Sequence, residues 1–147
     1  MSHNAPYHHF GDRTGLLGAV GVEAMTRFLA AQRAAVAAAS GPGEEMVALG
    51  TAYVEWAVAH PGASETIFDP TICPPGDPSS VMAPLTRANE ELLAEVTARL
   101  WPDLDPAALA ALQPSLWGTV HGLATLVSAG HLPADAVGPS LRVLMLR

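Results

Sequence analysis

Apolar residues recur every three or four positions through most of the chain, which is the spacing of one face of an α-helix. Leu17, Ala24 and Phe28 begin one such stripe, and Leu85, Leu92 and Val96 belong to another. The pattern predicts four long helices, from Asp12 to the SGPG stretch at 40–43, from Glu44 to the HPG stretch at 60–62, from Ser80 to Trp101, and from Asp105 to Gly130.

The segments between these helices are rich in Pro and Gly, which end regular structure. The stretch SETIF at 64–68 is expected to add a turn or two, and the loop DPTICPPGDPSS at 69–80 is expected to be irregular. Pro114 is expected to kink or divide the helix that contains it. A last, interrupted helix is expected over 134–147. Because no stretch alternates with the period of a strand, the chain is predicted to be all-α, a helical bundle.

The composition suits one domain with a real core, since 147 residues are half apolar and 14% charged. Seven Arg, no Lys and fourteen acidic residues give a net charge of −7, which disfavours broad attraction to nucleic acid or anionic membranes. A single cysteine, Cys73, and the lack of an export signal predict a reducing, cytoplasmic location. The apolar run at 116–132 is short for a membrane span, so it is predicted to be a core helix.

Three motifs follow one another along the chain: SHNAPYHHFGDRTGLLGAV at 2–20, YVEWAVAHPG at 53–62 and LWGTVHGLATL at 116–126. In this order they resemble motifs of TetR-type bacterial transcriptional regulators. The first resembles the end of the DNA-binding domain of that family, where a recognition helix passes through a Gly into a long connecting helix. YVEWAVAHPG at 53–62 is similar to the helix before an HP turn in that family, and LWGTVHGLATL at 116–126 resembles the Trp-His-Gly signature of the subgroup with the WHG C-terminal domain. The resemblance implies a remnant of the helix-turn-helix domain over 1–20 and an effector-binding and dimerisation domain over 21–147.

The resemblance also implies how such a chain works: a ligand bound between the C-terminal helices changes the separation of two DNA-binding domains in a dimer. Two further helices would precede residue 2 in that family, so binding of operator DNA is expected only from a longer form of the protein. Residues in the recognition-like helix are the candidates for vestigial DNA contacts: Ser2, His3, Asn4, Tyr7 and His8. The alternative is a stand-alone helical module that binds a ligand or a protein without touching DNA.

Aromatic and polar residues at helical spacing predict a ligand pocket with apolar walls and a few convergent polar groups. The candidate lining residues are Tyr53, Trp56, Phe68, Met82, Leu85, Asn89, Trp117 and His121. Trp117 and His121 share one helix face, where they either pack in the core or line the pocket. Gly118 and Gly122 permit close approach of another helix, within the domain or across a dimer.

No residue pattern indicates catalysis. Ser115 lacks a nucleophile elbow, and the adjacent Glu90 and Glu91 diverge on a helix, so they cannot act as a paired acid and base. His8 and His9 point about 100° apart on a helix, without further ligands at a suitable spacing. The chain is therefore predicted not to be an enzyme and to need no metal or cofactor. Its expected partners are an apolar small-molecule effector and a second copy, joined by the helices near 107–129 and 134–146.

Overall fold

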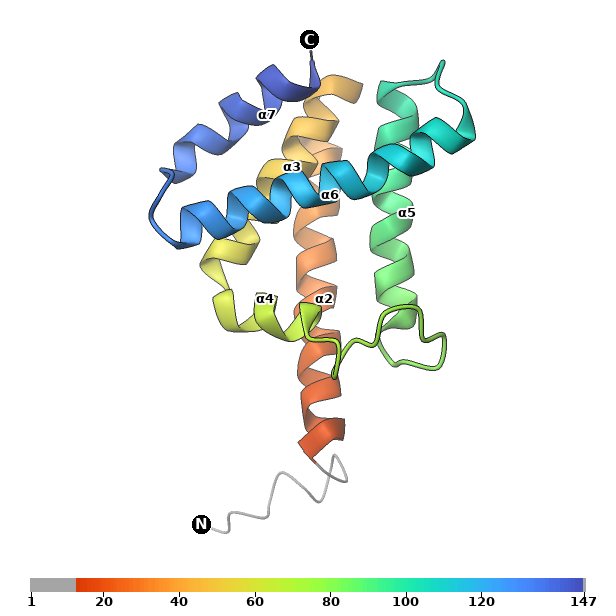
Figure 1. Cartoon of the computed structure of the whole chain (residues 1–147), viewed down its shortest axis with the longest axis vertical. Coiled ribbons are helices and arrows are strands. Elements are labelled where there is room, and N and C mark those ends of the chain that lie inside the picture. Colours follow the sequence, from red (N-terminus) through yellow and green to blue (C-terminus); the bar gives the residue numbers. More distant parts are fainter. Residues whose placement is uncertain (1–12, 147) are drawn as a thin grey trace.

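Helices alone make up the regular structure of residues 13–146, the part of the chain that the computed structural model describes (Figure 1). This confirms the all-α prediction. The recognition-like residues at 2–8 lie outside the described part. The elements are α2 (Arg13–Ala38), α3 (Pro42–Ala59), α4 (Pro61–Phe68), α5 (Ala83–Leu100), α6 (Pro106–Ser128), the short 3-10 helix η1 (Ala134–Ala136) and α7 (Val137–Met145).

Most helix boundaries follow from local chemistry. Gly41 has φ 93°, a left-handed conformation that glycine adopts readily, and Pro42 then opens α3. Asp105 caps α6, since its Oδ1 accepts a hydrogen bond from the backbone N–H of Ala108 at 2.8 Å. Gly130, with φ 74°, follows the end of that helix.

Two predicted helix starts were wrong, and the helix that contains Pro114 is not divided. The helical turns expected at 64–68 begin earlier, because Pro61 opens α4 directly after α3 and the helix runs to Phe68. Ser80 does not cap α5; its Oγ accepts from the N–H of Met82 at 3.2 Å in a turn, and the helix begins at Ala83. Pro114 does not divide α6, where it is exposed, so that water can solvate the carbonyl group that loses its intrahelical partner.

The core surrounds α3, which packs against α2, α4, α5, α6 and α7. Figure 1 shows α6 crossing the upright helices α3 and α5. The most deeply buried large apolar side chains come from four helices and the loop before α5: Phe28, Met46, Val54, Met82, Val96, Val137 and Leu141. The proposed division at residue 20 falls inside α2, which is continuous from Arg13 to Ala38.

Two ion pairs hold the N-terminal turn of α3 to its neighbours. Arg142 of α7 donates two hydrogen bonds to Glu44, and the Nε of Arg99 in α5 lies 2.7 Å from Glu45 Oε2. The hydrogen bond from Arg142 lowers the pKa of the Glu44 carboxyl group. Both pairs are at least partly exposed to solvent, so they position α3 more than they stabilise it.

Gly50 allows α3, α6 and α7 to approach closely. A Cβ atom at this position would lie 2.8 Å from Leu141 Cδ1 and 3.1 Å from Val120 Cγ1. Leu141 is fully buried and Val120 nearly so, and an added Cβ atom would have to displace both of these core side chains. The glycine is therefore required by packing.

A Gly50→Ala variant is expected to lower the free energy of unfolding by about 1–3 kcal/mol, because overpacking outweighs the gain in helix propensity. Urea denaturation measures the change. The matched control is Gly62→Ala, where an added Cβ meets nothing within 4 Å and stability should not fall. Equal stability of Gly50→Ala and the wild type would contradict this packing.

Within residues 13–146, none of the helices has the length and hydropathy needed to cross a lipid bilayer.

Candidate functional site

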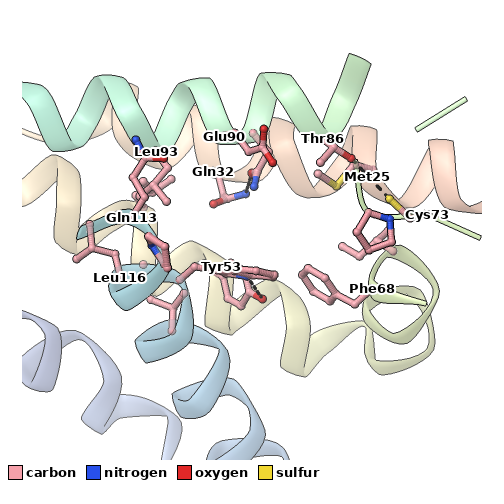
Figure 2. Close-up of a pocket in the computed structure, with 18 of the residues that line it drawn as sticks. Met25, Gln32, Tyr53, Phe68, Cys73, Thr86, Glu90, Leu93, Gln113 and Leu116 are labelled. Atoms are coloured by element: carbon pink, nitrogen blue, oxygen red, sulfur yellow. Dashed lines mark hydrogen bonds between the residues drawn. The ribbon is translucent and has the colours of Figure 1, made fainter. Parts of the chain in front are cut away.

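A cavity of about 530 Å³ lies between α2, α3, α4, α5 and α6 and is also bordered by the loop before α5 and by Met145 of α7 (Figure 2). Its walls are mainly apolar. The apolar lining residues include Met25, Met46, Leu49, Ile67, Phe68, Leu93, Leu116, Trp117, Val120 and Met145. A volume of this size is typical of sites for small organic molecules.

One wall of the cavity is aromatic. Phe68 of α4 lies with its ring centroid 6.2 Å from that of Tyr53 and 6.0 Å from that of Trp117. The His121 ring meets Phe68 edge to face, with centroids 5.3 Å apart. Such arrangements suit aromatic side chains and leave ring faces for an aromatic ligand.

The Tyr53 hydroxyl group joins this wall to α6. It forms a hydrogen bond with His121 Nδ1 at 2.9 Å and accepts one from Trp117 Nε1 at 3.4 Å. The Tyr53 side chain is buried, and burial raises the pKa of its phenol to about 12, while the hydrogen bond from Trp117 opposes the change. Tyr53 therefore presents a neutral ring to the cavity at physiological pH.

Tyr53 is expected to resist ionisation until the pH approaches 12, whereas an exposed tyrosine ionises near 10. The unfolded chain ionises first, so the stability due to the neutral phenol is complete below pH 10 and is lost as the pH rises from 10 to 12. The difference in tyrosinate absorbance between the wild type and Tyr53→Phe reports this group alone. A midpoint near pH 10 in the folded protein would contradict the burial of the hydroxyl group.

The opposite wall carries amide groups. Gln32 of α2 is only 4% exposed, and its Nε2 donates a hydrogen bond to Asn89 Oδ1 of α5 at 2.8 Å. Figure 2 shows the Gln32 side chain extending from its helix into the cavity. Cys73 Sγ and Thr86 Oγ1 lie 3.6 Å apart at the end nearest the loop. Among the described lining residues none is Arg, Lys or His, and Glu90, which is exposed, is the one carboxylate.

Residues 46–146 match the family model described as "Tetracyclin repressor-like, C-terminal domain". The chain belongs to this family. The match confirms the resemblance to TetR-type regulators at the level of this repressor-like domain, and the narrower placement in the WHG subgroup stays a prediction. The family is regulatory rather than catalytic.

A solved structure with the same fold is described as a protein with unknown function from Rhodococcus sp. RHA1. It is 30% identical to this chain with a TM-score of 0.81, and the alignment covers 99% of this chain and 77% of that one. No curated protein matches the chain. The function of the repressor-like domain must therefore be argued from its own cavity and surfaces.

The cavity of the repressor-like domain brings together four of the eight candidate residues, and a fifth lies beside it. Tyr53, Phe68, Asn89 and Trp117 line it, while the exposed His121 lies behind this wall, hydrogen-bonded to Tyr53 and in ring contact with Phe68. Binding of a ligand by these residues stays a prediction.

Three candidates do not line the cavity. Trp56 packs in the core, with its ring centroid 4.9 Å from that of Phe28, and stacks on His60 at 5.0 Å, because it faces α2 rather than α5. Met82 is fully buried and faces Gly21 of α2, where an added Cβ would lie 3.3 Å from its sulfur atom. Leu85, half-buried, packs against the core.

Of the cavity residues that the sequence did not predict, Gln32 is the buried polar one. It lies four residues after Phe28 on the same face of α2, so a polar residue interrupts a buried stripe. A buried polar side chain needs a partner, and this interruption was the available signal. No group of three or more His, Cys, Asp or Glu residues within 13–146 is arranged to hold a metal ion.

Helices α6 and α7 also carry exposed apolar side chains and two exposed glycines. We define the α6–α7 face as Gly118, Gly122, Leu126, Val143 and Leu144. Leu126 is 42% exposed and Leu144 is 62% exposed. A Cβ atom at Gly118 or Gly122 would meet nothing within 4 Å, so these glycines do not serve packing inside the domain.

Proposed function

We propose that this chain is the effector-binding and dimerisation part of a ligand-responsive transcriptional regulator. The observation that carries the proposal is the cavity of about 530 Å³, which is largely apolar and bordered by α2 to α6 in a chain whose residues 46–146 match a repressor-like domain. Its aromatic wall fits an apolar or aromatic small molecule. Membership of a regulatory family makes such a molecule an effector rather than a substrate.

The α6–α7 face supports a two-fold homodimer. Exposed Leu126, Val143 and Leu144 would be covered when α6 and α7 of two copies pack together. Gly118 and Gly122, four residues apart on α6, allow the backbones of two helices to approach closely. Since nothing inside the domain occupies the space beside them, a second chain accounts for both glycines.

The effector cavity and the dimer surface share α6. Trp117 of α6 lines the cavity and is half exposed, and Tyr53 is hydrogen-bonded to both Trp117 and His121. A ligand that displaces Trp117 or Tyr53 would therefore alter the position of α6 in the dimer. In a regulator with DNA-binding domains, such a movement changes their separation and relieves repression.

Operator DNA is proposed as a partner only of a longer form of the protein, and the cytoplasm as the place where it acts. The net charge of −7 and the lack of Lys give the chain little electrostatic attraction to a duplex. Cys73, the single cysteine, is compatible with a reducing compartment.

A cavity-blocking variant tests the effector site. Leu93 points into the cavity from α5, so Leu93→Trp places an indole ring in the space that a ligand would occupy (Figure 2). We expect the wild type to bind the neutral dye N-phenyl-1-naphthylamine with a rise in dye fluorescence, and the variant to bind it at least ~10-fold more weakly. The fluorescence titration gives both dissociation constants.

The control is Val81→Trp, which adds the same ring at a position that is 66% exposed and outside the cavity. It should bind the dye like the wild type. Both variants must melt cooperatively before they are compared. Undiminished binding by Leu93→Trp would place the dye elsewhere and contradict the proposal.

A further inference from the structure

The amide pair formed by Gln32 and Asn89 is the most buried polar feature of the cavity. Gln32 uses one amide hydrogen to reach Asn89 Oδ1, and the structure of residues 13–146 gives neither side chain a second hydrogen bond. The pair therefore retains the Gln32 carbonyl oxygen as an acceptor and the Asn89 amide N–H groups as donors. If both amides rotate by half a turn, the two residues exchange roles and the pair still offers one acceptor and one donor.

We infer that this pair selects an uncharged ligand with a hydrogen-bond donor next to an acceptor, such as a carboxamide or lactam attached to an apolar ring. The inference rests on the proposed effector site and names its ligand class. The ligand carbonyl group accepts from one amide of the pair, and the ligand N–H donates to the other. Its ring lies toward the aromatic wall of Phe68 and Trp117.

Anionic ligands are disfavoured by the charges around the cavity. No described lining residue carries a positive charge, and Glu90 adds a negative one. A carboxylate that enters such a site gives up its hydration without gaining an ion pair. A neutral amide loses less hydration free energy than a carboxylate when it leaves water, and its hydrogen bonds to the pair offset that loss.

Cationic ligands gain little from Glu90. Its side chain is exposed, so its carboxylate remains in water, where an ion pair contributes little. The buried polar groups nearest to it in the cavity, Gln32 and Asn89, are neutral. The observations thus favour the uncharged ligand over either ion.

The test compares four compounds that share one ring system. They are 2-naphthamide, 2-naphthoate, 2-naphthylmethylammonium and 2-methylnaphthalene, titrated against the chain by calorimetry at pH 7.5, where the first and last are uncharged. We expect the amide to bind roughly 10-fold more tightly than the methyl compound, which lacks the two hydrogen bonds. Both ions should bind more weakly than the amide.

The double variant Gln32→Leu/Asn89→Leu removes both partners, so no buried amide is left unsatisfied. It should lose the preference for the amide and keep its affinity for 2-methylnaphthalene. The matched control is Gln113→Leu, which removes another lining amide without touching the pair and should retain the preference. The ranking of the four compounds by the wild type decides the question even if the double variant does not fold.

The outcomes distinguish an error in the ligand class from an error in the proposed effector site. Tightest binding of either ion, or equal binding of the amide and the methyl compound, would overturn the ligand class and leave the effector cavity standing. Loss of the amide preference in Gln113→Leu but not in the double variant would also overturn it. If none of the four compounds binds, the proposed function fails together with the inference.

Discussion

A Gly122→Arg variant is expected to be a monomer of 15.2 kDa, whereas the wild type should have twice that mass at micromolar concentration. Gly122 is an exposed residue of the α6–α7 face, and an added Cβ atom there meets nothing within 4 Å. An arginine there would place an unpaired charge between two closely packed helices, which costs several kcal/mol. The same substitution improves helix propensity by about 1 kcal/mol, so the fold itself is not penalised.

Light scattering gives the two masses directly. The matched control is Gly62→Arg, which adds the same side chain to another exposed glycine with open space around it, on α4 and away from the α6–α7 face. This control should remain a dimer. A wild type that is monomeric, or a Gly122→Arg variant that keeps twice the chain mass, would refute the interface.

A Phe28→Ala variant is expected to lose about 3–5 kcal/mol of unfolding free energy, because the substitution removes a fully packed aromatic ring. Phe28 is 1% exposed, and its ring centroid lies 5.2 Å from that of Tyr53 and 4.9 Å from that of Trp56. The space that it vacates lies behind Tyr53 and is closed by neighbours that cannot all collapse into it. The aromatic wall of the cavity should therefore loosen as well.

Trp117→Ala is the informative comparison, since Trp117 is also aromatic but half exposed. Replacing Trp117 by alanine should lower the free energy of unfolding by clearly less than replacing Phe28 does. Urea denaturation of both variants in the Gly122→Arg background separates packing within the domain from contacts across the dimer. An equal or larger loss for Trp117→Ala would mean that the burial described for these two residues is incorrect.

The helices could be predicted because their sequence signals are local. The apolar stripes have the helical period, and Asp105 and Pro106 mark the start of α6 by capping and a preset φ. The starts of α4 and α5 have weaker local signals. His60 and Met82, the residues before these helices, form no side-chain cap, so only the prolines in their first turns, Pro61 and Pro84, mark the starts.

The aromatic wall of the cavity was also open to prediction, since Tyr53, Phe68 and Trp117 are among few aromatic residues in the chain. Periodicity does not say which side of α3 faces the cavity. Trp56, one turn after Tyr53, turns toward α2 and joins the core instead. The pairing of Gln32 with Asn89 joins residues 57 positions apart, a distance over which a helical repeat carries no information.

Gly118 and Gly122 show another limit of prediction from the sequence. Their spacing indicated close approach of a helix, but not whether that helix belongs to the same chain. An added Cβ atom at either position would meet nothing within 4 Å, so no other helix of residues 13–146 packs against these glycines. Packing of a second chain on these glycines is therefore part of the proposed dimer.

A crystal structure of the chain grown with 2-naphthamide tests the central claim, that a dimer built on α6 and α7 binds a small uncharged molecule between its helices. The account predicts a two-fold dimer with Gly118 and Gly122 at the helix contact. Each chain should hold one naphthamide, its amide group within hydrogen-bonding distance of Gln32 or Asn89 and its ring beside Phe68. An empty cavity with the compound bound elsewhere, or an α6–α7 face open to solvent, would contradict it.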